Sequence, residues 1–246
     1  MARKRSHQST FAPRRPRFWG RHAVAAALDN PRRKVLRAWA TRQAAELMQF
    51  PKEVAVTLAD VADLGRLVPG DAPHQGVVIE AEPLEDIWLD EIIAQAPERS
   101  VLLVLDQVTD PHNVGAILRS AAAFGAIGIV TQDRHSPPES GALAKAASGA
   151  LETVPWIRTV NLARALGDIA EAGFWRIGLA GDAETELKEA LGPGRVALVL
   201  GAEGAGLRHN TREHCDALAR LPITSAVESL NVSNAAAIAL YAASAG

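Results

Sequence analysis

The chain has 246 residues, of which 48% are hydrophobic and 22% charged, a composition typical of a globular protein with one large or two modest domains. No apolar run approaches the ~18 residues of a membrane-spanning helix, and the first residues lack the apolar stretch of a secretory signal. The single cysteine, Cys215, excludes an intramolecular disulfide, so we expect a cytoplasmic protein.

The net charge of −2 conceals a strong asymmetry along the chain. Residues 1–37 hold eleven Lys and Arg against one acid, Asp29, which gives this segment +10 and leaves −12 for the remainder. A basic segment on an acidic body is typical of proteins that bind a polyanion such as RNA. A tail that only aids solubility and an Arg-rich organellar transit peptide are the alternatives.

The first third of the chain predicts a basic tail followed by a small domain. Residues 1–17 contain few apolar side chains and are expected to be disordered. Strands and helices then alternate, which predicts a small α/β domain over residues 18–81 and a linker over 82–98 with room for a helix. The predicted helices are 20–28, 44–49 and 60–67, and the predicted strands are 35–40, 53–58 and 77–81.

Residues 99–246 predict a larger α/β domain. Its apolar strands lack the alternation of a half-exposed sheet, so we expect a mainly parallel sheet covered by helices on both faces. The predicted strands are 101–105, 127–131, 154–158, 175–180, 196–200 and 218–223. The predicted helices are 114–124, 139–149, 161–172, 184–191, 207–215 and 232–245.

The first polar motif, DQVTDPHNVGAILRS at residues 106–120, lies where a predicted strand passes into a helix. Ligands of open α/β sheets bind beyond the carboxyl ends of strands, so this position favours a binding site. Asn113 is interpreted either as the cap of the helix or as a functional amide. Arg119 has apolar neighbours, so its guanidinium needs an anion, carbonyl groups or a salt bridge.

Two further motifs follow later strands. The second, LGAEGAGL at residues 200–207, has three glycines that permit tight turns and close approach to a ligand. Their spacing differs from the G-x-G-x-x-G of dinucleotide-binding folds, and nothing in a plain turn requires Glu203. The third is Leu-Pro-Ile at 221–223 followed by ESLNVSNA at 228–235, in which Ser229 or Asn231 is a candidate helix cap.

Together, the three motifs resemble in order and spacing those of the SpoU (TrmH) family of RNA ribose methyltransferases, part of the SPOUT superfamily. The resemblance covers nearly the whole chain and is greatest to bacterial members that methylate a guanosine ribose in 23S ribosomal RNA. It implies a deep trefoil knot in residues 99–246, an RNA-binding role for 18–81, and a homodimer formed through the knot region. A transfer RNA is the alternative substrate.

The resemblance also implies S-adenosylmethionine as the cofactor, bound largely by backbone groups. The positions that match the family's cofactor loops are Gly181, Leu200, Gly201, Gly204, Leu221, Ile223, Leu230 and Val232. The positions that match its catalytic residues are Arg119, Asn113, Glu203, Ser229 and Asn231. The resemblance further implies that Arg119 favours the alkoxide form of the ribose 2′-hydroxyl or holds the adjacent phosphate. Asn113 would position the ribose or Arg119, and Glu203 would orient Arg119 or a substrate group. Asn234 departs from the small apolar residue usual after the third motif.

Other functions fit the sequence less well. The spacing of His209, His214 and Cys215 is not that of a zinc site, so no metal is expected. His112 is an alternative candidate for the general base. A non-catalytic RNA-binding protein is the principal alternative, although such a protein needs no cofactor loops. A nicotinamide-dependent enzyme would need the missing glycine fingerprint. The tryptophans are expected in the core: Trp19, Trp39, Trp88, Trp156 and Trp175.

Overall fold

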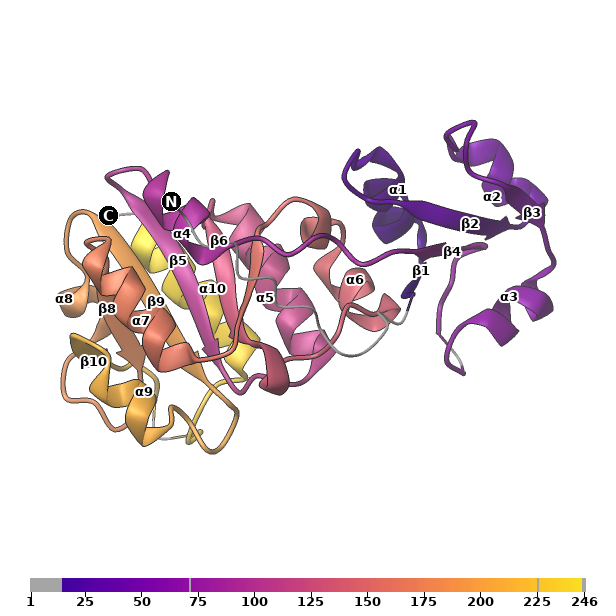
Figure 1. Cartoon of the computed structure of the whole chain (residues 1–246). Coiled ribbons are helices and arrows are strands. Elements are labelled where there is room, and N and C mark those ends of the chain that lie inside the picture. Colours follow the sequence, from indigo (N-terminus) through magenta and orange to yellow (C-terminus); the bar gives the residue numbers. More distant parts are fainter. Residues whose placement is uncertain (1–14, 71, 225, 245–246) are drawn as a thin grey trace. The chain divides into compact units, whose positions relative to one another are not determined.

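The structure, a computed structural model, describes residues 15–70, 72–224 and 226–244 (Figure 1). The chain divides into two compact units, one ending at Glu85 and the other beginning at Asp86. Most of the predicted basic tail lies outside the described residues. Its last residue, Arg17, begins a strand, so the prediction of disorder through residue 17 is wrong at that position.

The described residues of the first unit form a four-stranded sheet with three helices, and the alternating pattern predicts the helices and three of the four strands. The strand order is β1-β4-β2-β3; β4 pairs antiparallel with β1 and β2, and β3 pairs parallel with β2. Phe18, Leu64 and Ile79 are fully buried in its core. The strands are β1 (Arg17–Trp19), β2 (Val35–Ala40), β3 (Val56–Leu58) and β4 (Val77–Ala81), and the helices are α1 (Arg21–Asp29), α2 (Arg42–Leu47) and α3 (Val61–Leu67).

A row of charged side chains crosses this sheet. Arg17 of β1 and Arg37 of β2 are both in register with Glu80 of β4. Their guanidinium nitrogens lie 3.4 and 3.9 Å from the Glu80 carboxylate, whose side chain is only 12% exposed. Arg17 also stacks over Trp39, 5.7 Å from the ring centroid. Arg37 remains 62% exposed, so the row presents a cation to solvent.

The second unit contains a six-stranded sheet in which every pair is parallel, in the order β10-β8-β9-β5-β6-β7. The predicted mainly parallel sheet is therefore confirmed. Leu102, Leu103 and Val104 of β5 are all fully buried, which explains why the strand sequence shows no alternation. The strands are β5 (Ser100–Asp106), β6 (Gly128–Gln132), β7 (Trp156–Thr159), β8 (Trp175–Leu179), β9 (Arg195–Gly201) and β10 (Ala217–Ala219).

Helices cover both faces of this sheet (Figure 1). α4 (Leu89–Ala94) and α7 (Leu162–Glu171) contribute to the apolar core on one face, while α5 (Pro111–Ala123) packs against α6 (Gly141–Ala147) and α10 (Val232–Ser244) on the other. The α5–α6 contact needs Gly115, because a Cβ there would lie 2.5 Å from the carbonyl oxygen of Leu143. The short helices are α8 (Leu187–Ala190) and α9 (His209–Glu213), with single 3₁₀ turns at Asp133–His135 and Ala150–Glu152.

Three local predictions are wrong. α5 begins at Pro111 because Asp110 caps it, accepting a hydrogen bond from the His112 amide at 2.9 Å; Asn113 is therefore not the cap. β10 ends at Ala219, short of the predicted strand end at residue 223. Trp88 and Trp175 are 48% and 45% exposed and do not belong to the core.

No helix in the described ranges is long and apolar enough to cross a membrane.

Candidate functional site

Side chains from the three motifs meet beyond the carboxyl ends of β5 and β9. Asn113 Nδ2 donates to Glu203 Oε1 at 3.0 Å, and Asn231 Nδ2 donates to Asn113 Oδ1, also at 3.0 Å. Asn231 Nδ2 is also within hydrogen-bond distance of Glu203 Oε1, and the Val232 amide donates to the same oxygen at 3.3 Å. We call Asn113, Glu203 and Asn231 the polar cluster. It joins residues up to 118 positions apart in the sequence.

Backbone geometry places Glu203 at the tip of a tight loop, residues 201–207, which we call the glycine loop. Gly204 and Gly206 have φ values of 77° and 67°, a region that side-chain-bearing residues rarely occupy. The Gly206 amide donates to the Ala202 carbonyl at 2.9 Å, so the loop turns back on itself. A Cβ on Gly201 would lie 2.1 Å from the carbonyl carbon of Gly206, so this position needs glycine.

The third motif supplies both a cap and a member of the polar cluster. Asn231 immediately precedes α10, and its Oδ1 accepts a hydrogen bond from the Ser233 amide at 2.9 Å, which confirms it as a capping residue. Its Nδ2 remains free to reach the polar cluster, so capping and site formation use different atoms of one amide. Ser229 is exposed, and no hydrogen bond of its side chain is found within the described residues. Asn234 is exposed on α10.

Arg119 stands apart from the polar cluster. It lies six residues after Asn113 on α5, which places it roughly 120° around the helix, and it is exposed. The Glu203 carboxylate makes its contacts with amide groups, not with this arginine. Within the described part of the chain, Arg119 has no hydrogen-bond or ion-pair partner. Its guanidinium is therefore available to a ligand or to another protein chain.

The positions matched to cofactor loops follow the ends of three adjacent strands, β10, β8 and β9. Gly181 follows β8, Leu200 and Gly201 end β9, and Leu221 and Ile223 follow β10. Leu200 is 2% exposed and Val232 6%, so both can offer only backbone groups, whereas Ile223 is 40% exposed. The amides of Gly181, Leu221 and Leu230 have no backbone acceptor among the described residues. Unused donors beside exposed apolar carbon suit a heterocyclic ligand with polar edges.

Ion pairs that the sequence did not predict brace these loops. Arg208, directly after the glycine loop, bonds the fully buried Asp106 at the end of β5. Arg212 of α9 binds Asp182, beside Gly181, through two hydrogen bonds of 3.1 and 3.0 Å. These bonds lower the pKa of the Asp182 carboxyl. The sequence signals for these pairs are weak: Arg208 directly follows the glycine loop, and Asp182 directly follows Gly181.

The histidines and the cysteine considered as metal ligands have other partners. His209 lies 3.3 Å from Glu213, and His214 Nδ1 is 2.8 Å from the Asn210 carbonyl. Cys215 donates to the Thr211 carbonyl at 3.3 Å, and burial raises the pKa of its thiol to about 11. The described ranges contain no group of three or more His, Cys, Asp or Glu able to hold a metal ion. His112 is exposed.

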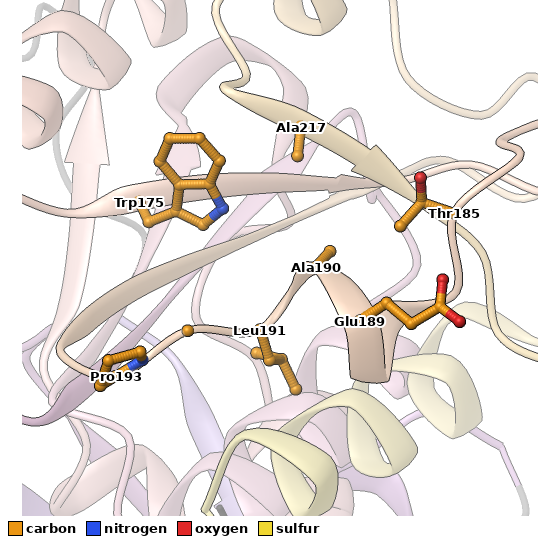
Figure 2. Close-up of a pocket in the computed structure, with 8 residues that line it drawn as sticks. Trp175, Thr185, Glu189, Ala190, Leu191, Pro193 and Ala217 are labelled. Atoms are coloured by element: carbon orange, nitrogen blue, oxygen red, sulfur yellow. The ribbon is translucent and has the colours of Figure 1, made fainter.

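An open pocket of about 440 Å³ is lined by residues of β8, β10 and the connection that contains α8 (Figure 2). The indole of Trp175, at the start of β8, and Ala217 of β10 form one side of it. The connection from Thr185 to Pro193, which includes α8, forms the other side. The pocket contains none of the residues singled out from the three motifs.

Comparison with known proteins matches both units. Residues 100–241 match the model of the SpoU rRNA methylase family, and residues 18–87 match a model described as RNA 2′-O ribose methyltransferase substrate binding. The 23S rRNA (guanosine-2′-O-)-methyltransferase RlmB of Ralstonia nicotianae is 44% identical over 231 residues, which cover 91% of this chain and 93% of that protein. The RlmB protein of Vibrio vulnificus is 39% identical over 235 residues, which cover 92% and 95%.

Solved structures share the fold over both units. The SpoU methyltransferase AviRb from Streptomyces viridochromogenes in complex with AdoMet aligns with a TM-score of 0.78 at 24% identity, covering 93% of this chain and 89% of that one. The AdoMet-bound rRNA methyltransferase from Sinorhizobium meliloti aligns with a TM-score of 0.74 at 25% identity, covering 92% and 85%.

Proposed function

The chain belongs to the SpoU rRNA methylase family and is an S-adenosylmethionine-dependent RNA methyltransferase, and we propose that it methylates the ribose 2′-hydroxyl of a guanosine in 23S ribosomal RNA. The RlmB relatives with that activity align with both units of the chain at about 40% identity. The observation within the molecule that carries the proposal is the polar cluster, because it assembles one residue from each of the three motifs at a single point.

S-adenosylmethionine supplies an activated methyl group when bound. We propose that the loops after β8, β9 and β10 hold it, with Ile223 offering apolar surface. The amides of Gly181, Leu221 and Leu230, which have no backbone acceptor within the described ranges, would face its polar edges. The remaining requirement is a nucleophilic oxygen held in line with the methyl group. A ribose 2′-hydroxyl is a poor nucleophile while protonated, so a nearby fixed cation that favours its alkoxide form lowers the barrier.

We assign that cation to Arg119, whose guanidinium has no partner in the described protein and always carries a charge. It can also bind the phosphate next to the target ribose. Asn113 and Asn231 share Glu203 as a common acceptor, which fixes the orientation of both amides. Fixed amides give the ribose defined hydrogen-bond partners. The exposed Ser229 would add a further polar group beside the polar cluster. Glu203 thus acts by holding the amides in place.

We further propose that two copies of the chain form a homodimer through the α5–α10 face. Ile238 and Tyr241 of α10 are 45% and 62% exposed beside α5, an unusual exposure for apolar side chains in one row. Arg119 lies on α5 of the same helix pair, without a partner among the described residues. A dimer that covers this face would bring the Arg119 of one protomer toward its partner's site.

A deep trefoil knot is also part of the proposal. α10 follows β10 at the edge of the sheet, yet it packs against β9, β5 and α5 further inward. Between β10 and α10 the chain therefore crosses back from the edge of the sheet, and Asn231 reaches the polar cluster. Such a crossing is needed for the chain to pass through one of its own loops, an arrangement that ordinary folds avoid.

The proposal is tested by incubating the purified protein with methyl-labelled S-adenosylmethionine and unmethylated 23S ribosomal RNA, and then mapping 2′-O-methylated nucleotides. We expect one labelled guanosine, and loss of label with Asn231→Ala. The exposed Glu171, on α7 away from the polar cluster, provides a control in Glu171→Gln, which should label normally. Label on transfer RNA alone, or on a base atom, would contradict the assigned substrate.

A further inference from the structure

We propose that Asp106 and Arg208 are positioning residues that clamp the base of the glycine loop. The clamp holds Glu203, at the tip of that loop, against the two asparagines of the polar cluster. As a statement about methyl transfer, the inference rests on the proposed function; as a statement about loop order, it stands on the geometry alone.

Asp106 is the last residue of β5 and has no solvent exposure. Both carboxylate oxygens are used by one residue: Oδ2 accepts from the Arg208 backbone amide at 3.0 Å, and Oδ1 accepts from Arg208 Nε at 2.7 Å. A buried carboxylate is costly unless it is paired and hydrogen-bonded. The Arg208 side chain is 39% exposed and keeps part of its hydration, whereas the Asp106 carboxylate, at 0%, depends on this pair to compensate its burial.

The same carboxylate-bearing residue reaches both ends of the glycine loop. Asp106 is in register with Gly201, where the loop leaves β9, and it bonds Arg208, where the loop ends. Leu207 is 6% exposed and anchors the returning strand of the loop in the core. Only five residues lie between Gly201 and Leu207, and Glu203 is one of them. Fixing the two ends of so short a segment fixes the position of its tip.

Asp106 also begins the segment that leads to Asn113. Gln107 adopts a left-handed φ of 60°, Val108 is buried, and Asp110 caps α5, which carries Asn113 in its first turn. The Asp106–Arg208 pair therefore joins the base of the first motif to the end of the second. This link sets the spacing of the 3.0 Å hydrogen bond between Asn113 and Glu203.

The clamp extends to the last residue of β6 and to the residue that follows β7. Arg208 Nη2 donates to Gln132 Oε1 at 3.0 Å, and Gln132 Nε2 donates to the Val160 carbonyl at 3.2 Å. The planar guanidinium is needed for this arrangement, because it donates in two directions at fixed angles. A lysine ammonium can pair with Asp106 but cannot reproduce the same fork. Arg208→Lys thus keeps the charge and loses the geometry.

The chain contains a matched control for this substitution. Arg176 likewise bonds Asp216 through its backbone amide and Nε, both at 2.8 Å, and its Nη2 also donates to Asp216, at 2.6 Å. This pair lies at the amino-terminal part of β8, away from the polar cluster. A purely structural role for both pairs predicts equal effects of Arg208→Lys and Arg176→Lys. A positioning role for Arg208 predicts that they differ.

The experiment measures kcat and KM on 23S ribosomal RNA at saturating S-adenosylmethionine, together with backbone amide hydrogen exchange. We expect Arg208→Lys to lower kcat by a factor on the order of 10 to 100, with KM for RNA nearly unchanged. Exchange at residues 202–206 should accelerate in this variant alone. Arg176→Lys should retain the wild-type kcat and loop exchange. Equal kcat values for the two variants, or unchanged loop exchange in Arg208→Lys, would overturn the inference.

The two readouts separate this inference from the proposed function. If the wild-type protein methylates no ribosomal RNA, the proposed function fails and loop exchange alone decides the clamp. If Arg208→Lys does not fold, the double variant Asp106→Asn with Arg208→Gln replaces the ion pair by neutral amides and avoids an uncompensated buried charge. It should fold and show the same rapid exchange at residues 202–206; wild-type exchange there would refute the clamp.

Discussion

Replacing Gly201 with alanine should disable the site without removing any polar side chain. A Cβ at this position would lie 2.1 Å from the carbonyl carbon of Gly206, 2.2 Å from its oxygen and 2.4 Å from the Leu207 nitrogen. Ordinary contact distances begin near ~3.5 Å, so the returning backbone of the glycine loop must retreat by more than about 1 Å.

The expected magnitudes follow from that displacement. Forcing a methyl group into a closed backbone contact costs about 1–3 kcal/mol of the free energy of unfolding, and in a protein of this size each kcal/mol lowers Tm by roughly 2–4 °C. The larger effect is on activity, because Glu203 moves with the loop and loses its 3.0 Å hydrogen bond to Asn113. A displacement of about 1 Å in a residue that positions the reacting groups costs on the order of a hundredfold in rate.

The assay compares Gly201→Ala with Gly167→Ala by thermal denaturation and by methyl transfer to 23S ribosomal RNA. Gly167 lies within α7, and a Cβ there would meet nothing within 4 Å. An alanine at that position should raise stability slightly, by about 0.5–1 kcal/mol, and leave the rate unchanged. The reasoning is refuted if Gly201→Ala keeps both the wild-type Tm and the wild-type kcat.

Three further predictions concern charge and titration. Arg119→Ala should bind S-adenosylmethionine normally by calorimetry and lose methyl transfer, whereas the exposed Arg164→Ala on α7 should keep both; full activity of the first variant would contradict the role assigned to Arg119. Arg37→Glu should raise KM for RNA and reduce, by about 1 or more, the slope of the logarithm of the binding constant against the logarithm of the salt concentration. Arg66→Glu is the comparison, because Arg66 is 78% exposed and already pairs with Asp63. Equal effects of the two reversals would show that the row of Arg17, Glu80 and Arg37 is not an RNA contact. Cys215 has a pKa raised from 9.0 to about 11 by burial, so the folded protein favours the protonated thiol. Its contribution to stability is therefore present below pH 9 and is lost as the pH rises through 11, and iodoacetamide labelling should accelerate near pH 11; a labelling midpoint near 9 would contradict the burial.

The parallel sheet was predictable because physical constraints on its strands leave a clear trace. A strand buried on both faces has no position for a polar side chain, so Val101–Leu105 is apolar throughout. The glycine loop was predictable for a similar reason, since its turns require residues without a Cβ. The resemblance of the three motifs to a known family pointed to Asn113, Glu203 and Asn231, which the structure brings together. It pointed equally to Arg119, which stands apart from the polar cluster.

Features that depend on distant partners were not predictable. Arg208 pairs with Asp106 across 102 positions, and nothing in the sequence distinguishes this carboxylate from the other acids. The start of α5 was misplaced because Asp110, rather than Asn113, supplies the cap, and both residue types cap helices well. β1 was missed because three residues are too few to establish a period. The exposure of Trp175 depends on its place at the start of β8.

The hydrogen bond between Asn113 and Asn231 has a consequence for how the protein is made. It closes a span of 118 residues and ties the first motif to nearly the last segment of the chain. Contacts so distant in sequence form late in folding, because chain entropy opposes them until the intervening elements are in place. During synthesis, β5, α5 and the glycine loop emerge from the ribosome well before residue 231. A nascent chain therefore has the sheet and two of the three motifs without a complete site, and the polar cluster can assemble only after residue 231 has been added and has reached the sheet.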